Sequence, residues 1–206
     1  MKTKLIKLTC GLALLGAAAT APAQSTLLYD NGAINGSINA WPIANGNHVA
    51  NTFTLSSDAT LTSATIGAWI LSADTLTSLD WSITTTAFAE GGSTLASGPA
   101  TISSSTLFGS VGSYNIYSES FSISPTVLDA GTYWFQLDNA VTVNSGPVYW
   151  DENDGPSTAA HFADISAMGS ESFQLYGTAA PAPEPTTLAL AGLGGLGILW
   201  QLRRRK

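Results

Sequence analysis

The chain has 206 residues and a formal net charge of −7, from seven Lys and Arg against 14 Asp and Glu. Every basic residue lies near an end, within residues 1–7 or 203–206, so residues 24–177 carry no Lys or Arg. This middle part has nothing with which to displace counterions from phosphates, which argues against nucleic acid as a partner. At about 150 residues it is the size of one ordinary domain.

Residues 1–23 have the pattern of a secretory signal peptide. A lysine-bearing start precedes an apolar stretch over residues 8–19 and the small-residue site Ala21-Pro22-Ala23. The apolar stretch is shorter than the roughly 20 residues that a membrane-spanning helix needs. We therefore predict export, with signal peptidase recognising Ala21 and Ala23 and cutting before Gln24.

Residues 24–177 show the period-two alternation of β-strands. Leu79, Trp81 and Ile83 point to one face of a predicted strand, while the polar residues between them point to the other. The same alternation recurs at residues 64–70, 117–123, 133–137 and 173–175. Turn signals such as Gly98-Pro99 and Asp154-Gly155-Pro156 separate the runs. The pattern predicts an all-β fold, an antiparallel β-sandwich of about eight to ten short strands, with the jelly roll as one form.

Two tryptophans of this domain are candidate glycan contacts. Trp134 has the opposite parity to Tyr133 and Phe135, so one of these two faces lies at or near the surface. Trp134 and Trp150 would then offer flat rings for stacking on sugars. The alternative interpretation is a second buried layer, or an aromatic pair across strands.

Residues 151–154 hold the densest cluster of oxygen ligands, in which Asp151, Asn153 and Asp154 are candidate calcium ligands. The EF-hand pattern fails from Gly155 onward, so a calcium site here would need another geometry. Because the domain has no Lys or Arg, an inorganic cation is the obvious group to neutralise carboxylates that lie close together. Ca²⁺ is therefore the one cofactor hypothesis, and an Asx-rich surface turn is its alternative.

The sequence contains no recognisable catalytic constellation. His48 and His161 have no metal-binding spacing, and no G-x-S-x-G motif occurs. Cys10 is the only cysteine and leaves with the signal peptide, so the mature protein has no thiol chemistry. We predict a non-enzymatic protein with no catalytic residues. A glycan-active hydrolase is the less favoured alternative, and it would need two carboxylates that face one cleft.

The C-terminal segment contains a linker and a predicted membrane anchor. Residues 178–187 are rich in Ala and Pro, and each X-Pro step moves the preceding residue out of the helical region. This linker contains Pro183-Glu184-Pro185 and leads into an apolar span that ends in Arg203, Arg204, Arg205 and Lys206. We predict one transmembrane helix with a basic cytoplasmic end over residues 188–206.

The order of Pro183-Glu184-Pro185, an apolar span and a terminal basic cluster resembles the PEP-CTERM sorting signal. The resemblance implies a Gram-negative bacterium that makes exopolysaccharide, and a tail that the membrane enzyme exosortase recognises and cuts. Residues 129–177 are similar to the β-sandwich cargo often found before such tails. We expect an inner-membrane-anchored precursor that becomes a cell-surface or extracellular-matrix protein associated with exopolysaccharide. A carbohydrate-binding module is the alternative.

Overall fold

The computed structural model describes residues 25–37, 39–162 and 164–180. The predicted signal cleavage site at Ala21 and Ala23, the sorting motif with Pro183, and the predicted membrane helix at 188–206 lie outside these residues. No helix in the described part of the chain is long and apolar enough to cross a membrane.

The described residues form thirteen β-strands and one 3₁₀ turn, η1. The elements are β1 (Thr26–Asp30), β2 (Ala40–Pro42), β3 (His48–Leu55), β4 (Ala59–Leu71), β5 (Leu76–Thr84), η1 (Ala87–Ala89), β6 (Thr94–Val111), β7 (Tyr114–Leu128), β8 (Gly131–Thr142), β9 (Val148–Asn153), β10 (Ala159–His161), β11 (Asp164–Met168), β12 (Ser170–Glu171) and β13 (Phe173–Ala179). Every strand pairing is antiparallel. The predicted all-β, antiparallel class is therefore confirmed.

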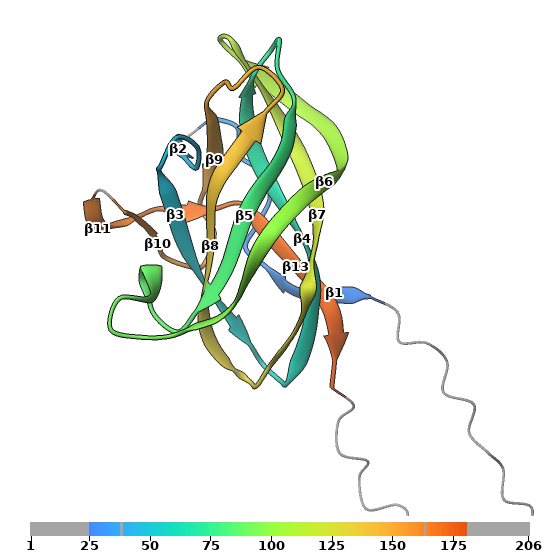
Figure 1. The fold of residues 1–206 in the computed structure, drawn as a ribbon, viewed down its shortest axis with the longest axis vertical. Helices are drawn as coiled ribbons and strands as arrows, with labels where there is room; N and C mark the ends of the chain where they lie inside the picture. The colour runs from blue at the N-terminus through green and yellow to red at the C-terminus, as the bar shows by residue number, and fades with distance from the viewer. Residues whose placement is uncertain (1–24, 38, 163, 181–206) are drawn as a thin grey trace, which may run out of the picture.

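The strands make one curled sheet whose two halves face each other. Its main path is β1-β13-β4-β7-β6-β5-β8-β3-β10-β11, and β9 joins the first half by pairing with β2, β4 and β12. The 18-residue strand β6 connects the halves, because its first part pairs with β5 and its second part with β7. Figure 1 shows β6 curving between these two neighbours. The result has two layers as predicted, but the layers are continuous through β6.

The predicted turn at Gly98-Pro99 is wrong, because both residues lie inside β6. Pro99 pairs with Asp80 of β5. β6 has no second neighbour along this part, so the missing N–H of proline breaks no ladder hydrogen bond there. Proline is tolerated at such an edge, which explains why the strand continues to 18 residues where the sequence predicted a break.

Apolar side chains from both halves of the sheet form one core. The predicted alternation at Leu79, Trp81 and Ile83 is confirmed, since all three are buried. Phe135 of β8 lies against Trp150 of β9, with ring centroids 6.0 Å apart, and so joins the two layers. Fully burying each large apolar side chain contributes roughly 1.5–3 kcal/mol, and this core replaces the disulfides that the mature domain lacks.

Candidate functional site

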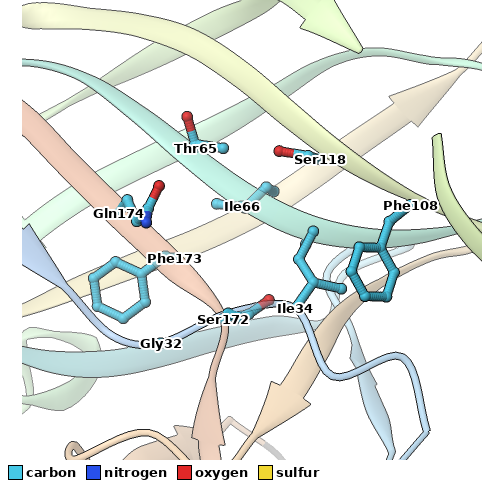
Figure 2. Close-up of a pocket in the computed structure, with 11 residues that line it drawn as sticks. Gly32, Ile34, Thr65, Ile66, Phe108, Ser118, Ser172, Phe173 and Gln174 are labelled. Carbon is cyan, nitrogen blue, oxygen red and sulfur yellow. The ribbon is translucent and has the colours of Figure 1, made fainter. Parts of the chain in front are cut away.

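The candidate site is a pocket of about 270 Å³ on the outer face of β4, β7 and β13. In these strands apolar residues that point inward alternate with polar ones, many of them Ser or Thr, so the outer face is rich in hydroxyl groups. Figure 2 shows Ile34 and Phe108 at one end of the pocket and Gln174 at the other, with Thr65 and Ser118 between them. Ile34 comes from the loop after β1, and Phe108 comes from β6.

Gly67 keeps the floor of this pocket open. A Cβ atom at this position would lie 2.3 Å from Ser172 Oγ and 2.9 Å from both Asp151 Cβ and Ile34 Cγ1. Contacts this short do not occur in folded proteins, so any side chain here would push the loop away from β4. Glycine is therefore required at position 67 because neighbouring atoms approach it so closely. Its backbone conformation is not the reason, since β4 has ordinary strand pairing with β7 at this residue.

Asp151 fastens the loop that forms one wall of the pocket. Its Oδ2 accepts a hydrogen bond from the backbone N–H of Asn35 at 2.8 Å, and its Oδ1 accepts one from that of Gly36 at 2.9 Å. The indole Nε1 of Trp69 donates to the same Oδ1 at 2.6 Å. Gly36 has φ +68°, which a residue with a side chain rarely adopts. Three donors thus hold a fully buried carboxylate and fix the path of the loop.

A buried polar network holds the start of the same loop. The Asn31 side chain donates to Ser170 Oγ at 2.6 Å and to the Glu171 backbone carbonyl at 2.5 Å. The Asn153 side chain donates to the backbone carbonyls of Asn31 at 2.9 Å and Ala33 at 3.1 Å. These asparagines therefore connect β9, β12 and the loop, and they position Ile34 at the pocket.

The pocket offers uncharged polar groups beside apolar walls. None of the residues that line it carries a charge. Ser172 Oγ is buried and has no hydrogen-bond partner, whereas the Thr65 hydroxyl lies 2.9 Å from that of Ser120. The Gln174 Oε1 accepts from the Tyr176 hydroxyl at 2.6 Å, and the Gln174 side chain lines the pocket. This arrangement suits a neutral ligand that has hydroxyl groups and an apolar face.

A pair of glutamates occupies the opposite face of β9. Glu171 of β12 lies directly across from Glu152. Glu152 Oε2 accepts a hydrogen bond from Trp41 Nε1 at 2.7 Å, but both carboxyl oxygens of the fully buried Glu171 lack any partner. Burial, followed by the charges of Glu152 and Asp151, raises the pKa of Glu171 well above its usual range. The neutral, protonated form of Glu171 is therefore favoured in the folded protein relative to the unfolded chain.

A second buried carboxyl group lies in β7. Glu119 is buried on the inner face, where Ser105 Oγ donates to its Oε1 at 3.0 Å and its Oε2 has no partner. Burial raises the pKa of Glu119 to about 7, although the Ser105 hydrogen bond lowers it. Since residues 24–177 contain no Lys or Arg, neither Glu119 nor Glu171 has a basic side chain of this domain as a partner.

The three predicted calcium ligands have different surroundings. The carboxylate of Asp151 accepts three N–H donors, Asn153 is buried in the polar network, and Asp154 is exposed. Among the residues that the structure describes, no three His, Cys, Asp or Glu side chains are grouped so as to hold a metal ion. Calcium binding by this segment stays a prediction.

The two predicted glycan contacts also differ. Trp150 is fully buried and donates its indole N–H to the Ser172 carbonyl at 2.8 Å, so the expectation of a surface stacking ring there is wrong. Trp150 lies between the two layers because its side chain is part of the hydrophobic core that they share. Trp134 is half-buried on β8, and its role as a glycan contact stays a prediction. His48 and His161 are placed near aromatic rings, beside Phe162 and Trp41 respectively.

The residues that line the pocket were not predicted from the sequence. Phe108 carried one usable signal: it follows Leu107 in a Ser- and Thr-rich run, and two successive strand residues cannot face the same core. Both are exposed, Leu107 by 57% and Phe108 by 55%. Gly67 and Ser172 gave no such signal, because their proximity depends on how β4, β9 and β13 pair.

The fold and site thus define an acidic, all-β domain with an uncharged surface pocket. Comparison with protein families identifies the segment that follows it: the PEP-CTERM protein-sorting motif matches residues 181–205. The resemblance predicted from Pro183-Glu184-Pro185 is confirmed, because the chain carries the PEP-CTERM protein-sorting motif at its C-terminal end. The motif implies an exported protein that is anchored in the membrane during sorting and processed by exosortase. No curated protein matches the chain.

Proposed function

We propose that this protein is a non-enzymatic component of the cell surface or extracellular matrix of a Gram-negative bacterium, where it associates with exopolysaccharide. The observation that carries the proposal is the sorting motif at residues 181–205. The motif determines the route, and the domain before it is the cargo that remains once signal peptidase and exosortase have acted.

The arrangement of the domain's ends supports this route. β1 pairs with β13 so that Thr26 lies opposite Gly177, and both ends of the domain therefore leave from the same end of this antiparallel strand pair. Figure 1 shows the two ends on the same side of the domain. A precursor held at the membrane by its tail would keep the rest of the domain directed away from the bilayer.

Cell fractionation tests the proposed destination. We expect the protein in the surface and matrix fractions of its native host, and full-length in the inner membrane of a strain that lacks exosortase. A protein found full-length in the inner membrane of both strains would overturn the proposal. If the chain is instead released into the medium without polysaccharide, as judged by size-exclusion chromatography, the proposed export stands and the proposed association with the matrix fails.

A carbohydrate-binding module is the second candidate, and the uncharged pocket beside Phe108 favours it. The glycan-active hydrolase is less favoured, because it needs two carboxylates facing an open cleft. Glu152 and Glu171 are adjacent, but the Glu171 side chain is fully buried. This pair would need a rearrangement of β12 before it met a substrate.

A further inference from the structure

We propose that the pocket on β4, β7 and β13 binds one neutral sugar unit of a polysaccharide, with Phe108 as the wall on which the sugar ring stacks. The inference rests on the proposed function and adds to it a site and a ligand class. Four features of the described residues carry it: the polar groups of the pocket, its volume, the position of Phe108 and the charge of the domain.

The polar groups of the pocket match a ligand that both donates and accepts hydrogen bonds. Ser172 Oγ is buried without a partner, and an unsatisfied buried hydroxyl costs free energy that a ligand hydroxyl would recover. The Ser118 hydroxyl and the Gln174 amide also line the pocket. A sugar hydroxyl is a donor and an acceptor at once, so it can satisfy hydroxyl and amide groups together.

The volume of about 270 Å³ restricts the ligand to one ring. Pockets for drug-sized ligands begin at about 300 Å³, so this pocket is at the small end of that range. A polysaccharide would therefore place a single unit in the pocket and continue along the surface on either side. The hydroxyl-bearing outer face around Thr65 and Ser120 is available to neighbouring units.

Phe108 is held in place and yet exposed, as a stacking wall must be. Its Cε1 atom lies 3.2 Å from the position that a Cβ atom would take at Gly36, so the loop packs against one part of the ring. The side chain is 55% exposed, which leaves an aromatic surface uncovered next to the pocket. Figure 2 shows the ring beside Ile34 at the end of the pocket. The apolar face of a sugar ring would cover this surface.

The charge of the domain favours a neutral sugar over an acidic one. Residues 24–177 contain acidic residues and no Lys or Arg, so an anionic polysaccharide would be repelled. The pocket also remains accessible while the tail anchors the precursor. From Gln174 to the end of the described chain at Ala180 is about 20 Å along an extended strand, which separates the pocket from the linker.

Binding to purified polysaccharides tests the inference. The full-length protein in detergent is run through gels that contain the host's exopolysaccharide, dextran or alginate, and retardation gives the affinity. The variant Phe108→Ala removes the proposed wall. The variant Phe162→Ala is the matched control, because Phe162 is also exposed, by 51%, and packs against His48 away from the pocket. Amide shifts at Ser118 and Gln174 on adding a neutral oligosaccharide provide a second readout.

We expect retardation by a neutral polysaccharide, roughly tenfold weaker affinity for Phe108→Ala and unchanged affinity for Phe162→Ala, with shifts at Ser118 and Gln174. If the wild type binds and Phe108→Ala binds equally well, the pocket assignment fails while the matrix function stands. Binding to alginate alone also overturns it. If no polysaccharide binds, the inference fails, and the fractionation experiment alone decides the matrix function.

Discussion

Glu171→Gln is the substitution for which the structure makes the most specific prediction. The side chain is fully buried, has no hydrogen-bond partner and lies across from Glu152. Glutamine keeps the shape of the side chain and cannot ionise. The variant therefore removes one buried titration and leaves the packing in place.

The sign of the effect follows from the raised pKa of Glu171. Above its ordinary pKa of 4.5, the unfolded chain has lost this proton while the folded chain still holds it. The stability linked to Glu171 is thus fully present below pH 4.5 and is lost as the pH rises through the folded pKa. In this interval the wild type loses about 1.4 kcal/mol per pH unit that the variant does not lose.

Urea unfolding, followed by tryptophan fluorescence at pH 5, 6, 7 and 8, measures this difference. The free energy of unfolding of Glu171→Gln should exceed that of the wild type by an amount that grows by about 1.4 kcal/mol per pH unit until the folded pKa is passed. Glu90→Gln is the control, because Glu90 is exposed, and its difference should stay near zero. A difference for Glu171→Gln that is the same at pH 5 and pH 8 would refute an unpaired, buried carboxyl group.

The remaining predictions concern the pocket and the second buried carboxyl. Gly67→Ala should destabilise the domain by about 1–3 kcal/mol through overpacking, whereas Gly109→Ala, with no atom within 4 Å of its Cβ, should have little effect in the same urea titration. Asp151→Asn should lower the free energy of unfolding by about 1–3 kcal/mol and speed hydrogen exchange at the Asn35 amide. Unchanged exchange at this amide would mean that Asp151 does not hold the loop in place. Glu119→Gln should raise the free energy of unfolding above that of the wild type by up to about 3 kcal/mol at pH 8 and by almost nothing at pH 4, because the folded pKa of Glu119 is about 7. An equal increase at pH 4 and pH 8 would contradict a pKa that is raised by burial.

The strands were predictable because alternation is a local signal. Leu79, Trp81 and Ile83 identify a strand and its buried face without any knowledge of its partners. Pro99 was misread as a turn because a local signal does not show whether a strand lies at an edge. That property depends on the pairing of β6, which is set over the whole chain.

The site was less predictable because its contacts join distant residues. Asp151 was a reasonable candidate metal ligand by composition, yet its donor Asn35 lies 116 residues away in the chain. The absence of Lys and Arg did indicate that buried carboxyl groups would lack basic partners. Which carboxyl groups these are depends on the register of β12 against β9, and the sequence does not contain that register in readable form.

Mass spectrometry of the protein from its native host tests the central claim of export and tail processing most directly. The chain should begin at Gln24 and lack its terminal basic cluster at residues 203–206. In a strain without exosortase, the same N-terminus should appear together with the intact C-terminal cluster. An intact C-terminus in both strains, or a retained Met1 in the wild type, would contradict the account.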